Sequence, residues 1–167
     1  MNTIVINLMM GISQGMQPLV SYRYGKCDGD SCKKLLGYGL KTALLFGGVC
    51  LVGLYLFAPQ VVSAYLSEAS SALVADSVVA FRQYSFSWLL VGFNVAIGGF
   101  LTALERPVPA IAISTGRGLI VQSAVVVSLA ALTAGGGLWF APVLSEVLVL
   151  AMAAVLLKRN LNQMKMM

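Results

Sequence analysis

The sequence is short of charge and contains no histidine. Charged residues make up 10% of its 167 residues and hydrophobic residues 59%, with a mean hydropathy of +0.88. A soluble domain typically carries about 25% charged residues. Two long stretches, 84–104 and 119–145, contain no Asp, Glu, Lys or Arg. This scarcity argues against an ordinary soluble domain and predicts a protein that crosses a membrane.

Other absences narrow the function. Without histidine the chain lacks the commonest general base and metal ligand. Its three cysteines are odd in number and irregularly spaced, which does not indicate a disulfide framework. Cys27 and Cys32 flank two aspartates, but two thiols do not complete a zinc site without a second pair. No phosphate-binding loop or nucleophile-elbow motif is present. We therefore predict no enzyme, no metal and no cofactor.

The apolar runs predict membrane-spanning helices. A helix needs about 20 mostly apolar residues to cross a bilayer, and the runs lack the two-residue alternation of a membrane barrel. We expect an all-α polytopic membrane helix bundle, a single membrane domain over residues 1–167. Its five predicted transmembrane helices cover approximately residues 2–22, 36–57, 79–103, 108–132 and 138–157.

The breaks between these spans are polar or rich in glycine and proline. The longest lies between the second and third spans, where 64–66 is a candidate interfacial segment. A run of three glycines, 135–137, divides the last two spans. Without that division, residues 146–157 would form a segment too short to cross the membrane.

The basic residues gather on one side of the predicted topology. Of the eleven Lys and Arg, all but Arg82 fall in or beside loops on the side of the C-terminus. Such an excess marks cytoplasmic loops, and it fits membrane orientation better than nucleic-acid binding. It predicts a multi-pass protein of the inner or plasma membrane with a cytoplasmic C-terminus. The N-terminus would then lie outside, on a first span whose clean apolar run is only 4–12. We therefore expect a fragment of a longer transporter with more helices before it.

Polar residues inside membrane spans are expensive and are candidates for function. In the first span, one helical face carries Asn7, Gln14, Gln17 and Ser21. Gly11 and Gly15 form a motif that permits close helix packing, and Pro18 is a candidate hinge because it removes a backbone hydrogen bond. The polar face either forms hydrogen bonds between packed helices or lines a water-filled cavity.

The third and fifth spans carry the other candidates. Asn94 lies near the middle of the third span and can bind a cation or an amine through its carbonyl oxygen, but cannot carry a proton. Glu146 lies 12 residues before Lys158, which is about 18 Å along a helix and near the membrane midplane. It is a candidate for proton exchange, or else a structural carboxylate. Pro142 is a second candidate hinge. Arg117 is expected near one end of the fourth span, with its side chain reaching the headgroups.

Four segments in order resemble one transporter family. They read GISQGMQPLVSYRYG at 11–25, GFN at 92–94 followed by ALERP at 103–107, STGRGL at 114–119 and GLWFAPVLSE at 137–146. They resemble helices eight, ten, eleven and twelve of the MATE (multidrug and toxic compound extrusion) family. The resemblance implies helices 8–12 of a twelve-helix, two-lobed transporter that expels cationic and amphipathic drugs in exchange for Na⁺ or H⁺.

The resemblance also sets expectations for partners and leaves alternatives open. The lipid bilayer, cationic small molecules and the missing N-terminal lobe would be its partners. The coupling carboxylates usual on the first and seventh helices of the family would lie outside this chain, and Asn94 stands where some members carry an acid. Cavity candidates are Gln14, Gln17, Asn94 and Glu146. The alternatives are a lipid-precursor or polysaccharide flippase of the related exporters and a truncated, non-transporting membrane fragment.

Overall fold

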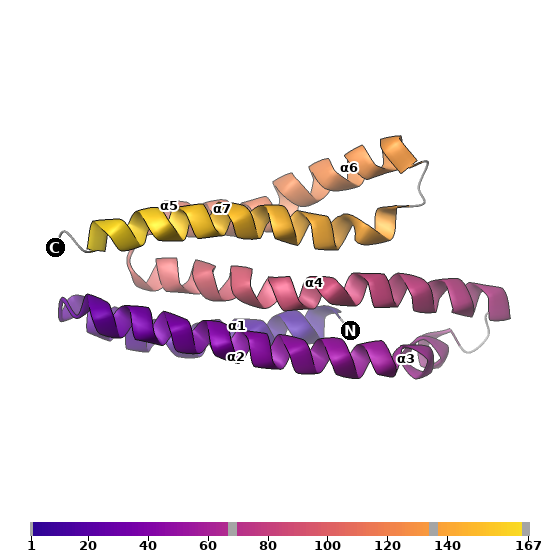
Figure 1. Ribbon diagram of the computed structural model, residues 1–167, viewed down its shortest axis with the longest axis horizontal. Coiled ribbons are helices and arrows are strands. Elements are labelled where there is room, and N and C mark those ends of the chain that lie inside the picture. Colours follow the sequence, from indigo (N-terminus) through magenta and orange to yellow (C-terminus); the bar gives the residue numbers. More distant parts are fainter. Residues whose placement is uncertain (1, 67–69, 134–136, 165–167) are drawn as a thin grey trace.

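The computed structural model describes residues 2–66, 70–133 and 137–164, which are helical apart from short turns (Figure 1). The elements, in chain order, are α1 (Asn2–Gly25), α2 (Gly29–Leu56), α3 (Ala58–Tyr65), α4 (Ser71–Ala103), α5 (Pro107–Thr115), the π-helix η1 (Gly116–Ile120), α6 (Val121–Thr133), the 3-10 turn η2 (Leu138–Phe140) and α7 (Ala141–Met164). α5, η1 and α6 run on as one helix, and η2 leads directly into α7. The all-α membrane bundle predicted from the sequence is confirmed.

Each predicted span falls on a helix. In the described residues, four helices are long and apolar enough to cross a membrane: Gly29–Leu56, Ser71–Ala103, Pro107–Thr133 and Leu138–Gln163. α1 has 24 residues but does not meet this criterion, in keeping with its short apolar run. The predicted break at the three glycines lies partly outside the described residues, between the end of α6 and the start of η2.

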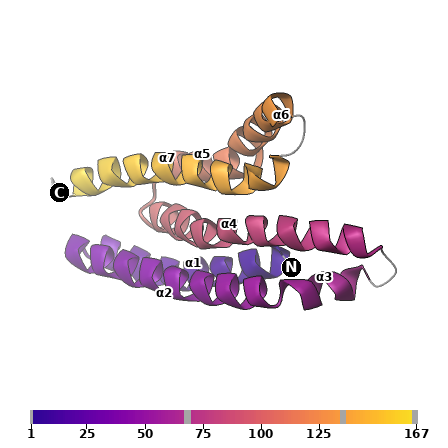
Figure 2. The ribbon, with the colours of Figure 1, turned by 45° about the vertical axis from the view of Figure 1, so that its right-hand side comes forward.

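α4 lies in the middle of the bundle. In both views α1 and α2 pack on one side of it, and the α5–α7 group covers the other (Figures 1 and 2). The buried residues of α4 accordingly pack against the helices on both sides. Trp88 and Val91 pack with Val5, Met9 and Ala43 of α1 and α2.

The contacts with the C-terminal helices involve the second half of α4. Ile97 and Leu101 pack with Ile113 of α5 and with Val149 and Ala153 of α7. The α1–α2 turn, the α4–α5 turn and the C-terminal end of α7 all lie at the same end of the bundle (Figure 1). α3 and the start of α7 lie toward the opposite end.

Two local structures add to the expectations from the sequence. The predicted interfacial segment at 64–66 overlaps the end of a short helix, α3, which has Pro59 in its first turn as a favourable start. Gly11 and Gly15 do not bring helices together within the described chain, because a Cβ at either position would meet nothing within 4 Å. The close approaches occur instead at glycines that face neighbouring helices.

Gly92 and Gly99 of α4 form two of these approaches. A Cβ on Gly92 would lie 3.0 Å from Met9 Sδ and 3.2 Å from Ala43 Cβ. A Cβ on Gly99 would overlap the Ser13 hydroxyl and lie 3.1 Å from Gln17 Nε2. The absence of side chains at these positions therefore sets the distance between α4 and α1.

We predict that Gly99→Ala destabilises the bundle by about 1–3 kcal/mol, the usual cost of overpacking, because the added methyl group would displace the Ser13 side chain from its contact with α4. Gly98→Ala is the matched control: its added Cβ meets nothing within 4 Å, so it should be neutral, or stabilise the helix by up to about 1 kcal/mol. Unfolding of the purified protein in detergent measures both. Equal stability of the two variants would contradict the packing described here.

Candidate functional site

The most polar part of the bundle interior is a link between α4 and α7. Asn94 of α4 is 1% exposed and Glu146 of α7 is 7% exposed. Asn94 Nδ2 donates one hydrogen bond to Glu146 Oε2 at 2.6 Å and another to the Glu146 backbone oxygen at 3.1 Å. Asn94 Oδ1 is buried and has no hydrogen-bond partner within the described residues. The predicted site residues Asn94 and Glu146 are thus joined by hydrogen bonds, and Asn94 Oδ1 is left as an acceptor without a partner in the described chain.

Arg117 completes this unit from the α5–α6 helix. One guanidinium nitrogen, NH1, lies 3.9 Å from Glu146 Oε1, and the Arg117 side chain is 24% exposed. The expectation that Arg117 would lie near a membrane surface is wrong. It lies ten residues after Pro107, which is about 15 Å into the helix, and it faces the buried carboxylate.

A local irregularity of the helix accompanies Arg117. Gly116–Ile120 form a π-helical turn between α5 and α6. Such turns inside α-helices are frequently found at functional sites. Glycines on both sides of Arg117 are the sequence signal for this irregularity. The turn changes the register of the side chains that follow it along the helix.

A cavity of about 300 Å³ is lined by Arg117 and Glu146, but not by Asn94. Its polar lining includes Asn2, Tyr84, Ser87, Arg117, Gln122 and Glu146. Gln122 is held by a hydrogen bond from the Ser145 hydroxyl to its side-chain oxygen. Carboxylate, amide and hydroxyl oxygens around a small cavity can hold a proton or a hard cation. No group of three His, Cys, Asp or Glu able to hold a metal occurs among the described residues.

The candidates on α1 lie away from this cavity. Gln17 is half-buried and donates to Ser13 Oγ at 3.5 Å. Gln14 is exposed on the surface of the described bundle. Two serines of α1 connect it to α4: Ser13 donates to Val95 O at 3.2 Å and Ser21 to Ala103 O at 3.1 Å. Ser13 was not predicted, because a serine in a helix gives no distinctive signal.

The two candidate hinges occupy different positions. α1 continues without a break through Pro18, which is exposed. Pro142 lies in the first turn of α7 and lines the polar cavity. A proline in the first turn of a helix removes no intrahelical hydrogen bond, so Pro142 also marks where α7 starts.

Comparison with known proteins gives the family. The MatE family model matches residues 1–127. The chain belongs to the MatE family. Over 100 residues it is 36% identical to the probable multidrug resistance protein NorM of Streptococcus pneumoniae serotype 4 (strain ATCC BAA-334 / TIGR4), a match that covers 59% of this chain and 21% of NorM.

Solved structures of this family share the fold. The chain matches a crystal structure of MATE in complex with MaL6 with a TM-score of 0.91 and 17% identity, over 99% of this chain and 37% of the other. It matches the outward-facing and the inward-facing conformation of a multidrug resistance MATE family transporter of the MOP superfamily with the same TM-score of 0.91 and 17% identity, again over 37–38% of those chains. The fold of this unit therefore fits both conformations equally well.

The link between α4 and α7 can be tested by mutation. Asn94→Ala removes both hydrogen bonds to Glu146 and leaves a buried carboxylate without its donor, which we expect to cost about 1–3 kcal/mol in the free energy of unfolding. Asn7→Ala makes the same change at an exposed position of α1 and should change stability by no more than about 0.5 kcal/mol. Denaturation in detergent measures both values. A loss for Asn94→Ala no larger than for Asn7→Ala would refute the link.

Proposed function

We propose that this chain forms part of a secondary active transporter that exports cationic and amphipathic compounds in exchange for Na⁺ or H⁺. The observation that carries the proposal is the buried Glu146 carboxylate in a polar cavity at the middle of a membrane bundle. Ionisable groups at such depth commonly mark ion or substrate pathways. Membership of the MatE family and the name of the NorM relative support the same activity.

The arrangement around Glu146 suits an exchangeable cation. Arg117 stands 3.9 Å away, beyond hydrogen-bond distance, so the ion pair leaves room for competition. Asn94 Oδ1 is an unused acceptor beside it. A proton on the carboxylate, or Na⁺ between carboxylate and amide oxygens, would each weaken the attraction of Glu146 for Arg117. Binding of the coupling ion would thereby change the charge balance of the cavity.

The positions of the remaining candidates suit contacts with parts of a transporter that lie outside this chain. The exposed face of α1 carries Asn7, Gly11, Gln14 and Pro18, a composition poorly suited to lipid. We propose that this face meets a water-filled cavity or the N-terminal lobe, with Pro18 inside α1 permitting bending. The end of the bundle that carries the basic loops would be cytoplasmic by the positive-inside rule.

One observation bears on the flippase alternative. Arg117 lines the cavity, and a phosphate-bearing lipid precursor would need a cationic cavity. The neighbouring Glu146 carboxylate offsets that charge, which favours cationic substrates over phosphates.

The third alternative, a fragment that does not transport, is distinguished from the proposed transporter by expressing the chain in two forms. The chain is tested alone and joined in frame to a complementary N-terminal part of a MatE relative, with ethidium export as the readout.

In the joined transporter we expect export that collapses when the ion gradient is dissipated. Export that persists with an uncoupler and without Na⁺ would contradict the proposal. So would export of phosphate-bearing lipids but not of cations. A chain that neither folds nor exports in either form would support the non-transporting fragment.

Glu146→Gln should lower gradient-driven export about tenfold, within the range typical of coupling free energies between sites, because the amide cannot exchange a proton or balance a cation. Glu105→Gln is the matched control, because Glu105 is exposed in the α4–α5 turn. Initial rates of ethidium export in energised vesicles measure the effect. Equal rates in the two variants would exclude Glu146 from the coupling step.

A further inference from the structure

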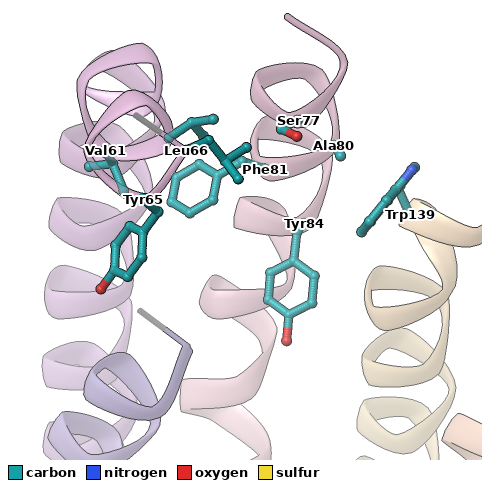
Figure 3. Close-up of a pocket in the computed structure, with 9 residues that line it drawn as sticks. Val61, Tyr65, Leu66, Ser77, Ala80, Phe81, Tyr84 and Trp139 are labelled. Carbon is teal, nitrogen blue, oxygen red and sulfur yellow. The ribbon is translucent and has the colours of Figure 1, made fainter. Parts of the chain in front are cut away.

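The described bundle has two large apolar hollows that differ in charge. A second cavity, of about 370 Å³, lies between α3, α4 and η2, and no charged residue of the described chain lines it (Figure 3). Its aromatic lining residues are Tyr65, Phe81, Tyr84 and Trp139. The other hollow is a groove of about 750 Å³ on α2, with aliphatic side chains, two glycines and a single charged residue, Lys41. We call it the α2 groove.

The α2 groove lies on the outer surface of the bundle. α2 is at the edge of the bundle and packs against α1 and α4 (Figures 1 and 2). On the groove side, Leu45 is 65% and Val49 63% exposed. Gly53 lies 12 residues after Lys41, so the groove is about 18 Å long, and half of a bilayer core is roughly 15 Å thick. The groove is therefore long enough to hold one acyl chain of a lipid.

Two glycines deepen the groove without serving helix packing. A Cβ on Gly48 or on Gly53 would meet nothing within 4 Å. Gly47, on the neighbouring face of α2, is different, because a Cβ there would lie 3.3 Å from Leu89 Cα of α4. Packing within the described chain thus accounts for Gly47 but not for the two glycines of the groove.

Lys41 places a positive charge at the end of the groove nearer the basic loops. It lies five residues inside the predicted span 36–57, about 8 Å along the helix. A charge at this depth is costly unless it pairs or reaches the headgroups. The two acids near the start of α2 pair with other bases, Asp28 with Arg23 and Asp30 with Lys33. Lys41 forms no ion pair with a described residue, so its charge is available to an anion from outside.

The same face of α2 continues with residues suited to lipid headgroups. Tyr38 and Lys34 precede Lys41 by three and seven residues, which places them on its side of the helix. Tyr38 is 64% exposed and Lys34 is also exposed. Tyrosine is enriched at the membrane interface, and basic residues beside a span attract anionic lipids. Cationic and aromatic groups followed by an apolar groove match the polar and apolar parts of a phospholipid.

We propose that the α2 groove binds an anionic phospholipid, with its phosphate at Lys41 and one acyl chain along Leu45 and Val49. The proposal does not depend on the transport activity proposed above. The rival explanation is that the groove is covered by any lipid of the bilayer, whatever its headgroup. In that case the charge of Lys41 would have no effect on which lipid binds.

The headgroup is tested on the whole chain in detergent, titrated with dioleoyl phosphatidylglycerol or dioleoyl phosphatidylcholine and followed by native mass spectrometry. Wild type should bind the anionic lipid about fivefold more tightly, the contribution of one basic residue near the membrane surface. Lys41→Gln should remove this preference and Lys41→Arg should keep it. Lys158→Gln is the matched control, because Lys158 is an exposed base at the same end of the bundle that does not line the groove.

The acyl chain is tested by filling the groove. Gly48→Leu should leave helix packing intact, since its Cβ position is open, and should weaken phosphatidylglycerol binding about tenfold, roughly the loss of two buried CH₂ groups. Gly11→Leu is the control, at an equally open position of α1. Equal Kd values for the two lipids, or equal effects of a groove variant and its control, would overturn the proposal. So would competition by glycerol phosphate as strong as that by the lipid, which would indicate a site for free anions.

Discussion

A bilayer core supplies no hydrogen-bond partners, which favours side-chain hydrogen bonds between neighbouring helices. This constraint explains the central place of α4. Ser13 and Ser21 of α1 donate to backbone oxygens of Val95 and Ala103 in and at the end of α4, and α4 in turn donates through Asn94 to α7. The polar contacts therefore join the two sides of the bundle through one helix, while small residues such as Gly99 let the helices approach closely enough to form them.

The same constraint decides how much of the site was predictable. Charge-free runs and basic loops suffice to predict five helices and to single out Asn94 and Glu146 as polar groups in an apolar setting. Their pairing was not predictable, because the two residues are 52 positions apart and no spacing rule relates them. Arg117 was misplaced because it was assigned to one end of its span, although it lies ten residues after Pro107. Its contact with Glu146 was not predictable, because it depends on the packing of α7, which hydropathy does not record.

The two cavities are related through Tyr84, which lines both. One is polar and contains a carboxylate with a distant arginine partner; the other is apolar and aromatic.

The central claim is that these helices cross lipid with their basic ends on one face, and labelling with a membrane-impermeant maleimide tests it most directly. Cys27 is exposed in the α1–α2 turn, Asn162 is exposed near the end of α7 and Ser63 is exposed on α3. In single-site cysteine variants at these positions, we expect Cys27 and Asn162→Cys to react only in inside-out vesicles and Ser63→Cys only in right-side-out vesicles. Reaction of Cys27 and Asn162→Cys from opposite sides would contradict the account.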